Sequence, residues 1–372
     1  MHKLTRLLIP LAIFFVSACS DNSTDPPETR INKRIVQIVD SVVANSHVPG
    51  CIAGIWAPDE DISLVYAAGY SNPDDLSPML ADYLFRIGSN TKTMTITVLL
   101  QLVDEGKIRL DDKLSEYMPG LPHSDSVTIE MLCNMTSGYF NYSESEYMEQ
   151  IAASNPTKVW QPDELIAIAM DNPIYFPPGT GFHYSNTNTI IIGKLIEQLT
   201  GLPLKENIET RIFLPLGLGH TYFMTSGIDY PDQHFCHGYY NGEYVDGHPD
   251  FSEVFDISWA WAAGSGISEV RDLKTYVEAL VGGDFISDEL QQKRLECNIE
   301  VDESRHYGIG MMNVSGFYGH SGGLMGYSSF MVRDPERNCT AVIMLNCQLH
   351  EISATDVFKL IAKEIYPEIV FW

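Results

Sequence analysis

The chain has 372 residues, of which 45% are hydrophobic and 19% are charged, so it can bury a substantial core in one large domain or two packed ones. Aromatic and branched apolar residues occur along the whole length, which argues against disorder. The 49 acidic and 23 basic residues give a formal net charge of −26. This excess argues against nucleic-acid binding, because such binding needs clustered Lys and Arg.

The N-terminal segment has the pattern of a secretion signal. Residues 1–18 combine a basic start, an apolar run too short to span a bilayer comfortably, and small residues at the end. Cys19 follows directly and resembles the lipidated cysteine of a bacterial lipobox. We therefore expect an exported lipoprotein, anchored to a membrane by its N-terminal lipid and facing the periplasm or the cell exterior. An ordinary signal peptide is the alternative.

Residues 19–30 are polar, contain a Pro-Pro pair and predict a flexible tether. Beyond them, hydrophobic periodicity predicts strands near both ends of the chain and helices between. The predicted elements are a helix over 31–43, strands over 51–56 and 62–67, a long helix from 89 to about 106, a helix over 189–200, strands over 327–332 and 340–346, and a helix over 353–365.

This order predicts an α+β fold in which one sheet is assembled from both termini. The α/β part covers about 31–95 and 256–372, and a mainly helical insertion covers about 96–255. Six further cysteines are scattered along the chain, and an oxidising compartment permits disulfides, although buried free thiols are at least as probable a state. They are Cys51, Cys133, Cys236, Cys297, Cys339 and Cys347. No Cys/His cluster suggests a metal, and we expect no cofactor.

The first motif with chemical potential is Ser89 followed three residues later by Lys92. A serine hydroxyl is a poor nucleophile at neutral pH and needs a neighbouring base. On a helix this spacing puts the amine one turn away and on the same face. The helix start also favours negative charge developing near Ser89. A Ser N-cap beside an exposed Lys is the alternative interpretation.

The second motif is Tyr184 followed by Asn186, after a Pro/Gly-rich approach and just before a predicted helix. A tyrosine near the serine can relay its proton, and an amide can orient substrate. The same Y-x-N pattern also occurs at residues 139–141 and 239–241. A loop held at the start of a helix is the better platform for chemistry, which favours the copy at Tyr184.

The third motif covers residues 319–323 and contains His320, Ser321 and Gly322, just before a predicted strand. Small residues on a strand edge let a substrate amide lie against the backbone. His320 can hydrogen-bond the Tyr or Lys of the other two motifs, depending on its protonation state. A structural loop histidine is the alternative.

The three motifs in this order and at these spacings resemble the serine β-lactamase and penicillin-binding DD-peptidase superfamily. The similarity is greatest to the class C branch, which includes D-alanyl-D-alanine carboxypeptidases. Framework segments at residues 85–93, 99–107, 127–138 and 258–264 resemble it as well, so the likeness covers nearly all of residues 31–372. The resemblance implies an antiparallel sheet flanked by helices, a helical insertion domain and catalysis through an acyl-enzyme.

By the same resemblance Ser89 would be acylated, while Lys92 and Tyr184 would share the base and acid duties. Asn186 would hold the substrate amide, and His320 would stand where β-lactamases usually place a lysine. Whether Lys92 or Tyr184 takes the first proton stays open.

The resemblance also implies the surroundings of the reacting carbonyl. Ser321 and Gly322 would complete the strand edge. The oxyanion hole would combine the backbone N–H of Ser89 with one from the strand near Ser328 or Ser329. Trp259 would form an aromatic wall of the cleft, with a core tryptophan as an equal alternative.

The expected activity is that of a D-alanyl-D-alanine carboxypeptidase-like peptidase acting on peptidoglycan stem peptides, with β-lactams as acylating ligands. His320 in place of lysine argues against a dedicated β-lactamase and matches DD-peptidases and esterase-like members better. A second observation argues against a carboxypeptidase: the chain has no Arg between Arg305 and Arg333 that could bind a substrate carboxylate. An esterase or D-amino-acid amidase or aminopeptidase of the same fold is therefore the alternative, and a non-catalytic sensor of cell-wall fragments is a third.

Overall fold

A computed structural model describes residues 27–227, 234–240, 250–348 and 351–371. Cys19, the predicted signal segment and residues 19–26 of the predicted tether lie outside the described residues. The first helix, α1 (Pro27–Asn45), begins inside the predicted tether, so that residues 27–30 are helical. Proline fits the first turn of a helix because the N–H it lacks would have no partner there. In the described part of the chain, no helix has the length and apolar character needed to cross a membrane.

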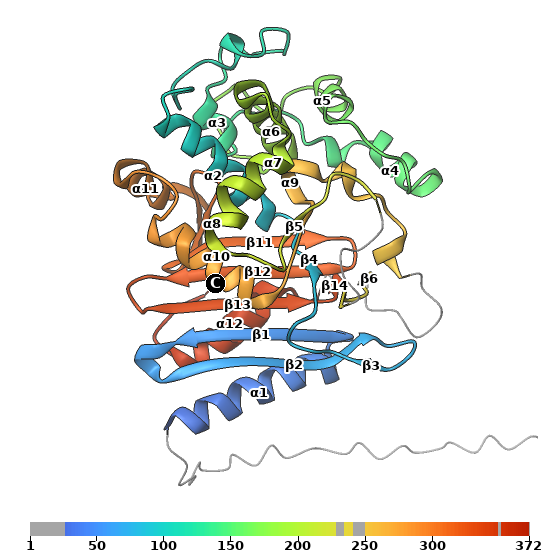
Figure 1. Cartoon of the computed structure of the whole chain (residues 1–372), viewed down its shortest axis with the longest axis vertical. Helices are drawn as coiled ribbons and strands as arrows, with labels where there is room; N and C mark the ends of the chain where they lie inside the picture. The colour runs from blue at the N-terminus through green and yellow to red at the C-terminus, as the bar shows by residue number, and fades with distance from the viewer. Residues whose placement is uncertain (1–26, 228–233, 241–249, 349–350, 372) are drawn as a thin grey trace, which may run out of the picture.

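A nine-stranded antiparallel sheet forms the base of the molecule (Figure 1). The order of its strands is β3-β2-β1-β13-β12-β11-β10-β9-β8. They are β1 (Gly50–Ala57), β2 (Ile62–Asn72), β3 (Ser77–Pro78), β8 (Ile299–Asp302), β9 (Arg305–Tyr307), β10 (Met312–Val314), β11 (Phe317–Leu324), β12 (Tyr327–Asp334) and β13 (Cys339–Leu345). The β1–β13 pair, in which Cys51 lies opposite Leu345, joins the N-terminal hairpin to the C-terminal strands. The predicted α+β fold, with one antiparallel sheet built from both termini, is confirmed.

Helices cover both faces of this sheet. One face packs on α1 and α12 (Ala354–Ile365), and the other packs on α10 (Val270–Gly282) and the helical part of the chain. Along β12 successive side chains point to opposite faces. Phe330 and Val332 therefore join the core under α1 and α12, whereas Met331 joins the core on the other face.

The helical part lies above the sheet in Figure 1 and is connected to it by short strands. Its helices are α2 (Asn90–Asp104), α3 (Ile129–Cys133), α4 (Glu146–Ser154), α5 (Pro162–Met170), α6 (Asn186–Thr200), α7 (Leu204–Ile208), α8 (Leu214–Leu216) and α9 (Trp261–Gly264). The remaining elements are α11 (Asp288–Leu295), β4 (Phe85–Arg86), β5 (Tyr222–Phe223), β6 (Tyr239–Tyr240), β7 (Gly266–Ser268) and β14 (Cys347–Gln348).

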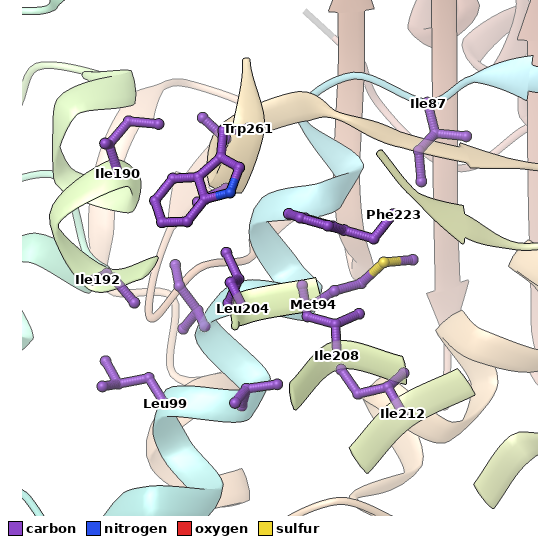
Figure 2. Close-up of a cluster of buried hydrophobic side chains, with 14 of the residues drawn as sticks. Ile87, Met94, Leu99, Ile190, Ile192, Leu204, Ile208, Ile212, Phe223 and Trp261 are labelled. Atoms are coloured by element: carbon purple, nitrogen blue, oxygen red, sulfur yellow. The ribbon is translucent and has the colours of Figure 1, made fainter. Parts of the chain in front are cut away.

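Helix α2 runs through the middle of the molecule. Met94 and Leu99 of α2 lie in a cluster with residues of α6, α7 and α9, among them Ile190, Ile208 and Trp261 (Figure 2). The sequence predicts one apolar stripe on this helix, but nearly every residue from Asn90 to Leu102 is buried. The four threonines in this stretch can be buried because each hydroxyl donates a hydrogen bond to a backbone carbonyl oxygen.

The six described cysteines are all buried free thiols, which agrees with the second of the two states expected for them.

Candidate active site

Ser89 lies where the chain leaves β4 and enters α2. The preceding residue, Gly88, has φ +51°, and a Cβ there would lie 2.8 Å from the backbone oxygen of Gly323 on β11. Only glycine allows both this backbone conformation and this close approach. The turn therefore places Ser89, directly before α2, against the edge of β11.

Ser89 does not act as a helix cap, because its side chain accepts no hydrogen bond from the helix backbone. Lys92 instead donates a hydrogen bond from Nζ to the Ser89 Oγ, at 2.9 Å, and another to the Ala263 carbonyl oxygen, at 2.8 Å. The side chain of Lys92 is completely buried. The alternative of a cap beside an exposed lysine is therefore wrong.

Burial holds the pKa of Lys92 well below its ordinary value. Among the described residues no carboxylate forms an ion pair with it. A neutral amine that donates one N–H to the Ala263 carbonyl can turn its lone pair toward the Ser89 hydroxyl. Lys92 is thus placed as a base for Ser89.

The carbonyl that orients Lys92 belongs to α9, a helix that starts in strained backbone. Trp261 has φ +28°, which is rare for a residue with a side chain. Its ring packs so closely on α6 that a Cβ at Gly193 would lie 2.8 Å from it. The carbonyls that follow accept from Thr95 and Lys92 of α2. The strain is held by the core shown in Figure 2 and serves to aim these carbonyls at α2.

Tyr184 lies next to this pair, immediately before α6. The Lys92 Nζ is 4.9 Å from the centre of the Tyr184 ring. The Tyr184 hydroxyl is buried and makes no well-aligned hydrogen bond to a described residue. Burial raises the pKa of Tyr184, and the nearby Ser89 side chain opposes this effect. A buried hydroxyl with an unfilled partner position is suited to a group that a substrate brings.

His320 lies beside Tyr184, as the third motif predicts, but its side chain hydrogen-bonds Tyr307 rather than the Tyr or Lys of the other two motifs. Its ring centroid lies 6.0 Å from that of Tyr184, and its Nε2 lies 3.2 Å from the hydroxyl of Tyr307. Its Nδ1 lies 2.6 Å from the Ser321 carbonyl oxygen. In the resting site both ring nitrogens are therefore occupied by groups other than Lys92 and Tyr184.

Asn186 is the first residue of α6 and is held by a small polar network. Its side-chain Nδ2 donates to Ser143 Oγ at 3.0 Å, and its backbone N–H donates to Asn141 Oδ1 at 3.1 Å. Ser143 Oγ in turn donates to Asn141 Oδ1. Asn141 comes from the Y-x-N copy at residues 139–141, so this second copy supports the first one.

The strand edge beside Ser89 belongs to β11. The ladder between β10 and β11 covers only Phe317–Gly319. Along the rest of β11, no described strand pairs on that side. Gly322 lies where a Cβ would come within 2.0 Å of the Ile87 carbonyl oxygen, and Gly323 lines the crevice at Ser89. This open edge can pair with an extended substrate.

Ser328 and Ser329 lie on β12, which is paired with β11 on one side and β13 on the other. The Ser328 Oγ accepts from the Ala354 backbone N–H, so its side chain faces α12 rather than the cleft. Ser329 donates to the Ile87 carbonyl. The structure thus leaves Ser328 outside the site, and its ladder partner Gly323 takes its place beside Ser89.

Two connected cavities open at this site. A crevice of about 20 Å³ borders Ser89, and a cavity of about 590 Å³ continues from it. Both are lined by Asn186, Trp259, Gly323 and Leu324. Trp259 is partly exposed in this wall, as the cleft interpretation of this residue predicts.

The larger cavity is mostly apolar. Its aromatic lining residues are Trp160, Tyr240, Phe251, Phe255 and Trp259. Among its described lining residues the single charged side chain is that of Glu149, which is exposed. No described lining residue of either cavity is a lysine or an arginine.

Residues 35–363 match the sequence profile of the family described as Beta-lactamase. The chain belongs to the beta-lactamase family. The family fold accounts for the arrangement of sheet and helices described above, and the chain is a serine hydrolase of this fold.

Solved structures of this beta-lactamase family include several enzymes that are similar to the present chain. A D-stereospecific amidohydrolase from Streptomyces sp. superposes with a TM-score of 0.79 and 28% identity, over 90% of this chain and 99% of that one. A D-amino acid amidase from Ochrobactrum anthropi SV3 superposes with a TM-score of 0.81 and 26% identity, over 91% of this chain and 99% of that one.

Two curated proteins are similar to this member of the beta-lactamase family, and one of them has a penicillin-binding name. Penicillin-binding protein 4* of Bacillus subtilis is 27% identical over 303 residues, which are 77% of this chain and 66% of that protein. Protein flp of Staphylococcus aureus is 25% identical over 324 residues, which are 84% of this chain and 63% of that protein. The alignment thus spans slightly less than two thirds of the length of these relatives.

Sequence reasoning missed Tyr307 and the positions of Asn141 and Ser143 in this beta-lactamase-family site. Tyr307 belongs to a three-residue strand, β9, which carries no motif. Asn141 did carry a signal, the repeated Y-x-N pattern, but the pattern alone could not separate a supporting residue from a functional one.

Proposed function

We propose that this serine hydrolase forms an acyl-enzyme on Ser89 and hydrolyses small amides or peptides of D-amino acids that carry an apolar side chain. One observation carries the proposal. Ser89, hydrogen-bonded to a buried Lys92, opens into a mostly apolar cavity whose described lining offers a carboxylate, Glu149, and no cation. An ammonium group and an apolar side chain fit this lining, whereas a substrate carboxylate would lack a partner.

In the proposed mechanism, Ser89 Oγ attacks the substrate carbonyl carbon while its proton passes to the neutral Lys92 amine, directly or through Tyr184. Backbone N–H groups of Ser89 and Gly323 stabilise the resulting oxyanion. Each such donor is typically worth about 3 kcal/mol in the transition state.

Tyr184 then returns a proton to the leaving amine as the C–N bond breaks. Water hydrolyses the Ser89 ester and regenerates the hydroxyl. Asn186 Nδ2 is placed to hold the acyl-side carbonyl, exchanging its bond to Ser143 Oγ for one to substrate.

The likeness to the D-stereospecific amidohydrolase and the D-amino acid amidase supports this substrate class, because both align over nearly their full length. D-alanyl-D-alanine carboxypeptidase activity is the second candidate and is favoured by the likeness to penicillin-binding protein 4*. An esterase activity uses the same steps with an alcohol as the leaving group.

Acylation of Ser89 is the core of the proposal and can be tested directly. The protein is incubated with a fluorescent penicillin and with an activated nitrophenyl ester, and the adduct is located by mass spectrometry of peptides. We expect label on Ser89 and none in Ser89→Ala. Label that survives Ser89→Ala, or no acylation by either reagent, contradicts the proposal and favours a non-catalytic sensor.

Turnover then separates the substrate classes. Initial rates are compared for D-phenylalanine amide, L-phenylalanine amide, D-phenylalanine methyl ester and acetyl-D-Ala-D-Ala. We expect the D-amide to exceed both the L-amide and the peptide. A faster reaction with acetyl-D-Ala-D-Ala would favour the carboxypeptidase candidate, and hydrolysis of the ester alone would favour an esterase.

We also propose that the chain is exported and lipidated at Cys19, on the sequence pattern of residues 1–19 alone. Labelling of growing cells with a radioactive fatty acid tests this. Incorporation that is lost in Cys19→Ser is expected, and an unlabelled protein cleaved elsewhere would contradict it.

A further inference from the structure

His320 is the residue of the site whose protonation the geometry fixes most tightly. It is 1% exposed, and both ring nitrogens have partners. The partner of Nδ1 is the Ser321 carbonyl oxygen, which can only accept, so Nδ1 carries a proton. In the neutral ring Nε2 then has a lone pair, which accepts a hydrogen bond from the Tyr307 hydroxyl.

Tyr307 is built into the wall behind the catalytic tyrosine. It is 1% exposed and lies on β9, two strands away from His320 on β11. Its ring meets that of Tyr184 edge-on, with centroids 6.1 Å apart at 86°, and it packs on Phe182 as well. The Tyr307 hydroxyl therefore reaches His320 from a ring that the core holds in place.

The charged and titratable groups around this pair disfavour a positive charge on His320. A proton on Lys92 of α2 would oppose a second positive charge on His320. The rings of Tyr184 and Tyr307 also face His320 and carry neutral phenol groups. Around Tyr307 lie the buried guanidinium of Arg294 and the thiols of Cys133 and Cys297. Among the described residues no carboxylate pairs with His320.

Burial accordingly lowers the pKa of His320 to about 3, although the hydrogen bond to the Ser321 carbonyl opposes this effect.

We infer that Tyr307 is a positioning residue that fixes His320 as the neutral Nδ1–H tautomer, and that it thereby keeps the strand edge beside Ser89 without a cation. A site of this kind selects substrates without a free carboxylate at that edge. The part of the inference that concerns selectivity rests on the proposed function, whereas the tautomer does not.

The tautomer can be observed without any activity. The intact protein is labelled with ¹⁵N-histidine, and the ring nitrogens are followed by NMR between about pH 5 and pH 8. The His320 signals are assigned by their loss in His320→Gln or, if that variant does not fold, by their shift in Tyr307→Phe. His47 and His123, which are exposed, serve as internal reference signals.

We expect His320 to show a protonated Nδ1 and a bare Nε2 throughout this range. In Tyr307→Phe the Nε2 lone pair loses the hydrogen bond that stabilises the neutral ring, so the pKa of His320 should rise and its ring nitrogens should begin to respond to pH at the acid end of this range. An Nε2–H tautomer in the unaltered protein, or a His320 that titrates there, would overturn the inference.

The selectivity is measured with two peptides that differ only in one charge, acetyl-D-Ala-D-Ala and its C-terminal amide. In the unaltered protein the ratio of their kcat/KM values, carboxylate to amide, should not change between about pH 8 and pH 5.5. In Tyr307→Phe it should rise about twofold over this interval, because the fraction of His320 that becomes protonated near pH 5.5 attracts the carboxylate.

Tyr70→Phe, at an exposed tyrosine, is the matched control and should leave the ratio unchanged. A purely structural role of Tyr307 would lower both kcat/KM values together and leave their ratio flat. A flat ratio while His320 titrates therefore refutes the selectivity. If neither these peptides nor D-phenylalanine amide acylates Ser89, the proposed function fails, while the NMR result still decides the tautomer.

Discussion

Replacement of Lys92 by methionine tests the central element of the site in two independent ways. Methionine is close to lysine in length and can fill the buried space, but it has no amine. If the neutral Lys92 amine takes the Ser89 proton, Lys92→Met should lower kcat/KM about 10²–10⁴-fold, the usual contribution of a general base. The rate of Ser89 acylation by a nitrophenyl ester, followed by stopped flow, measures this loss.

The second effect concerns stability. The pKa of Lys92 is lowered in the folded protein and ordinary in the unfolded chain, so unfolding takes up a proton at any pH between the two values. The free energy of unfolding must then rise with pH across that window. With Lys92 neutral at pH 7.5, the gain from one such group between pH 7.5 and 9.5 is about 2.7 kcal/mol, at about 1.4 kcal/mol for each pH unit.

Lys92→Met removes this pH-dependent contribution to the free energy of unfolding. It also leaves the Ala263 carbonyl without its hydrogen-bond donor, at a cost of about 1–3 kcal/mol that does not depend on pH. The difference in unfolding free energy between the two proteins should therefore grow by about 2.7 kcal/mol in favour of Lys92 over these two pH units. Urea unfolding at each pH measures it, with Lys205→Met, a surface lysine that is 47% exposed, as the control. A difference that does not change with pH would show that Lys92 is charged in the folded state and would refute its role as a base.

Three further substitutions test the surroundings of this pair. Gly322→Ala should destabilise the fold by about 1–3 kcal/mol and slow Ser89 acylation, because its Cβ would lie 2.0 Å from the Ile87 carbonyl oxygen. Thermal unfolding and labelling measure these effects, and Gly120→Ala, at a glycine with open space around it, is the control. Asn141→Ala removes the acceptor of the Asn186 backbone N–H and should raise KM several-fold with a smaller change in kcat; an unchanged KM would show that Asn186 needs no such support. Ala152→Phe fills part of the apolar cavity and should reduce kcat/KM for D-phenylalanine amide at least tenfold more than for D-alanine amide, whereas equal losses would place the substrate side chain elsewhere.

Local sequence patterns predicted the parts of the fold that depend on local physics. The predicted helix that starts at Ser89 is α2. The predicted strand at 327–332 is β12 with two further residues, and the predicted strand at 340–346 is β13, which starts and ends one residue earlier. The first two motifs named Ser89, Lys92, Tyr184 and Asn186, and all four lie at the site. Order along the chain and helical spacing were sufficient for this.

The rest depends on contacts between distant segments. The edge strands β8, β9 and β10 are three or four residues long, too short for a periodic signal, and β9 supplies Tyr307. The order of strands in the sheet decides which strand borders Ser89. Local sequence patterns do not reveal that order. The oxyanion donor was therefore sought on β12, at Ser328 or Ser329, although the open edge belongs to β11 and Gly323.

The partner of His320 could not be predicted for the same reason. The motif shows a histidine before Ser321, but the choice among Lys92, Tyr184 and Tyr307 depends on which ring nitrogen the Ser321 carbonyl occupies. The backbone of β11 sets that choice, because it places the Ser321 carbonyl oxygen beside Nδ1. It determines whether the strand edge carries a charge.

Charge acts on substrate selection at long range as well as inside the site. The chain has a net charge of −26, its described cavity lining contributes Glu149 and no cation, and burial lowers the pKa of both Lys92 and His320. A cationic amino-acid amide is therefore attracted to the molecule, and a substrate with a free carboxylate is repelled. Added salt screens both effects, since the Debye length falls from about 30 Å at 0.01 M to about 8 Å at 0.15 M.

The value of kcat/KM for D-phenylalanine amide should accordingly fall several-fold over this range of ionic strength, while that for its uncharged N-acetyl derivative should stay constant. The ratio of the two cancels any effect of salt on the protein itself. Glu149→Gln should reduce the salt dependence of the cationic substrate only in part, because the remaining charge of the molecule still attracts it. If both substrates respond equally to salt, the charge of the molecule does not select the substrate, and the apolar cavity and the hydrogen bonds at Ser89 must do so alone.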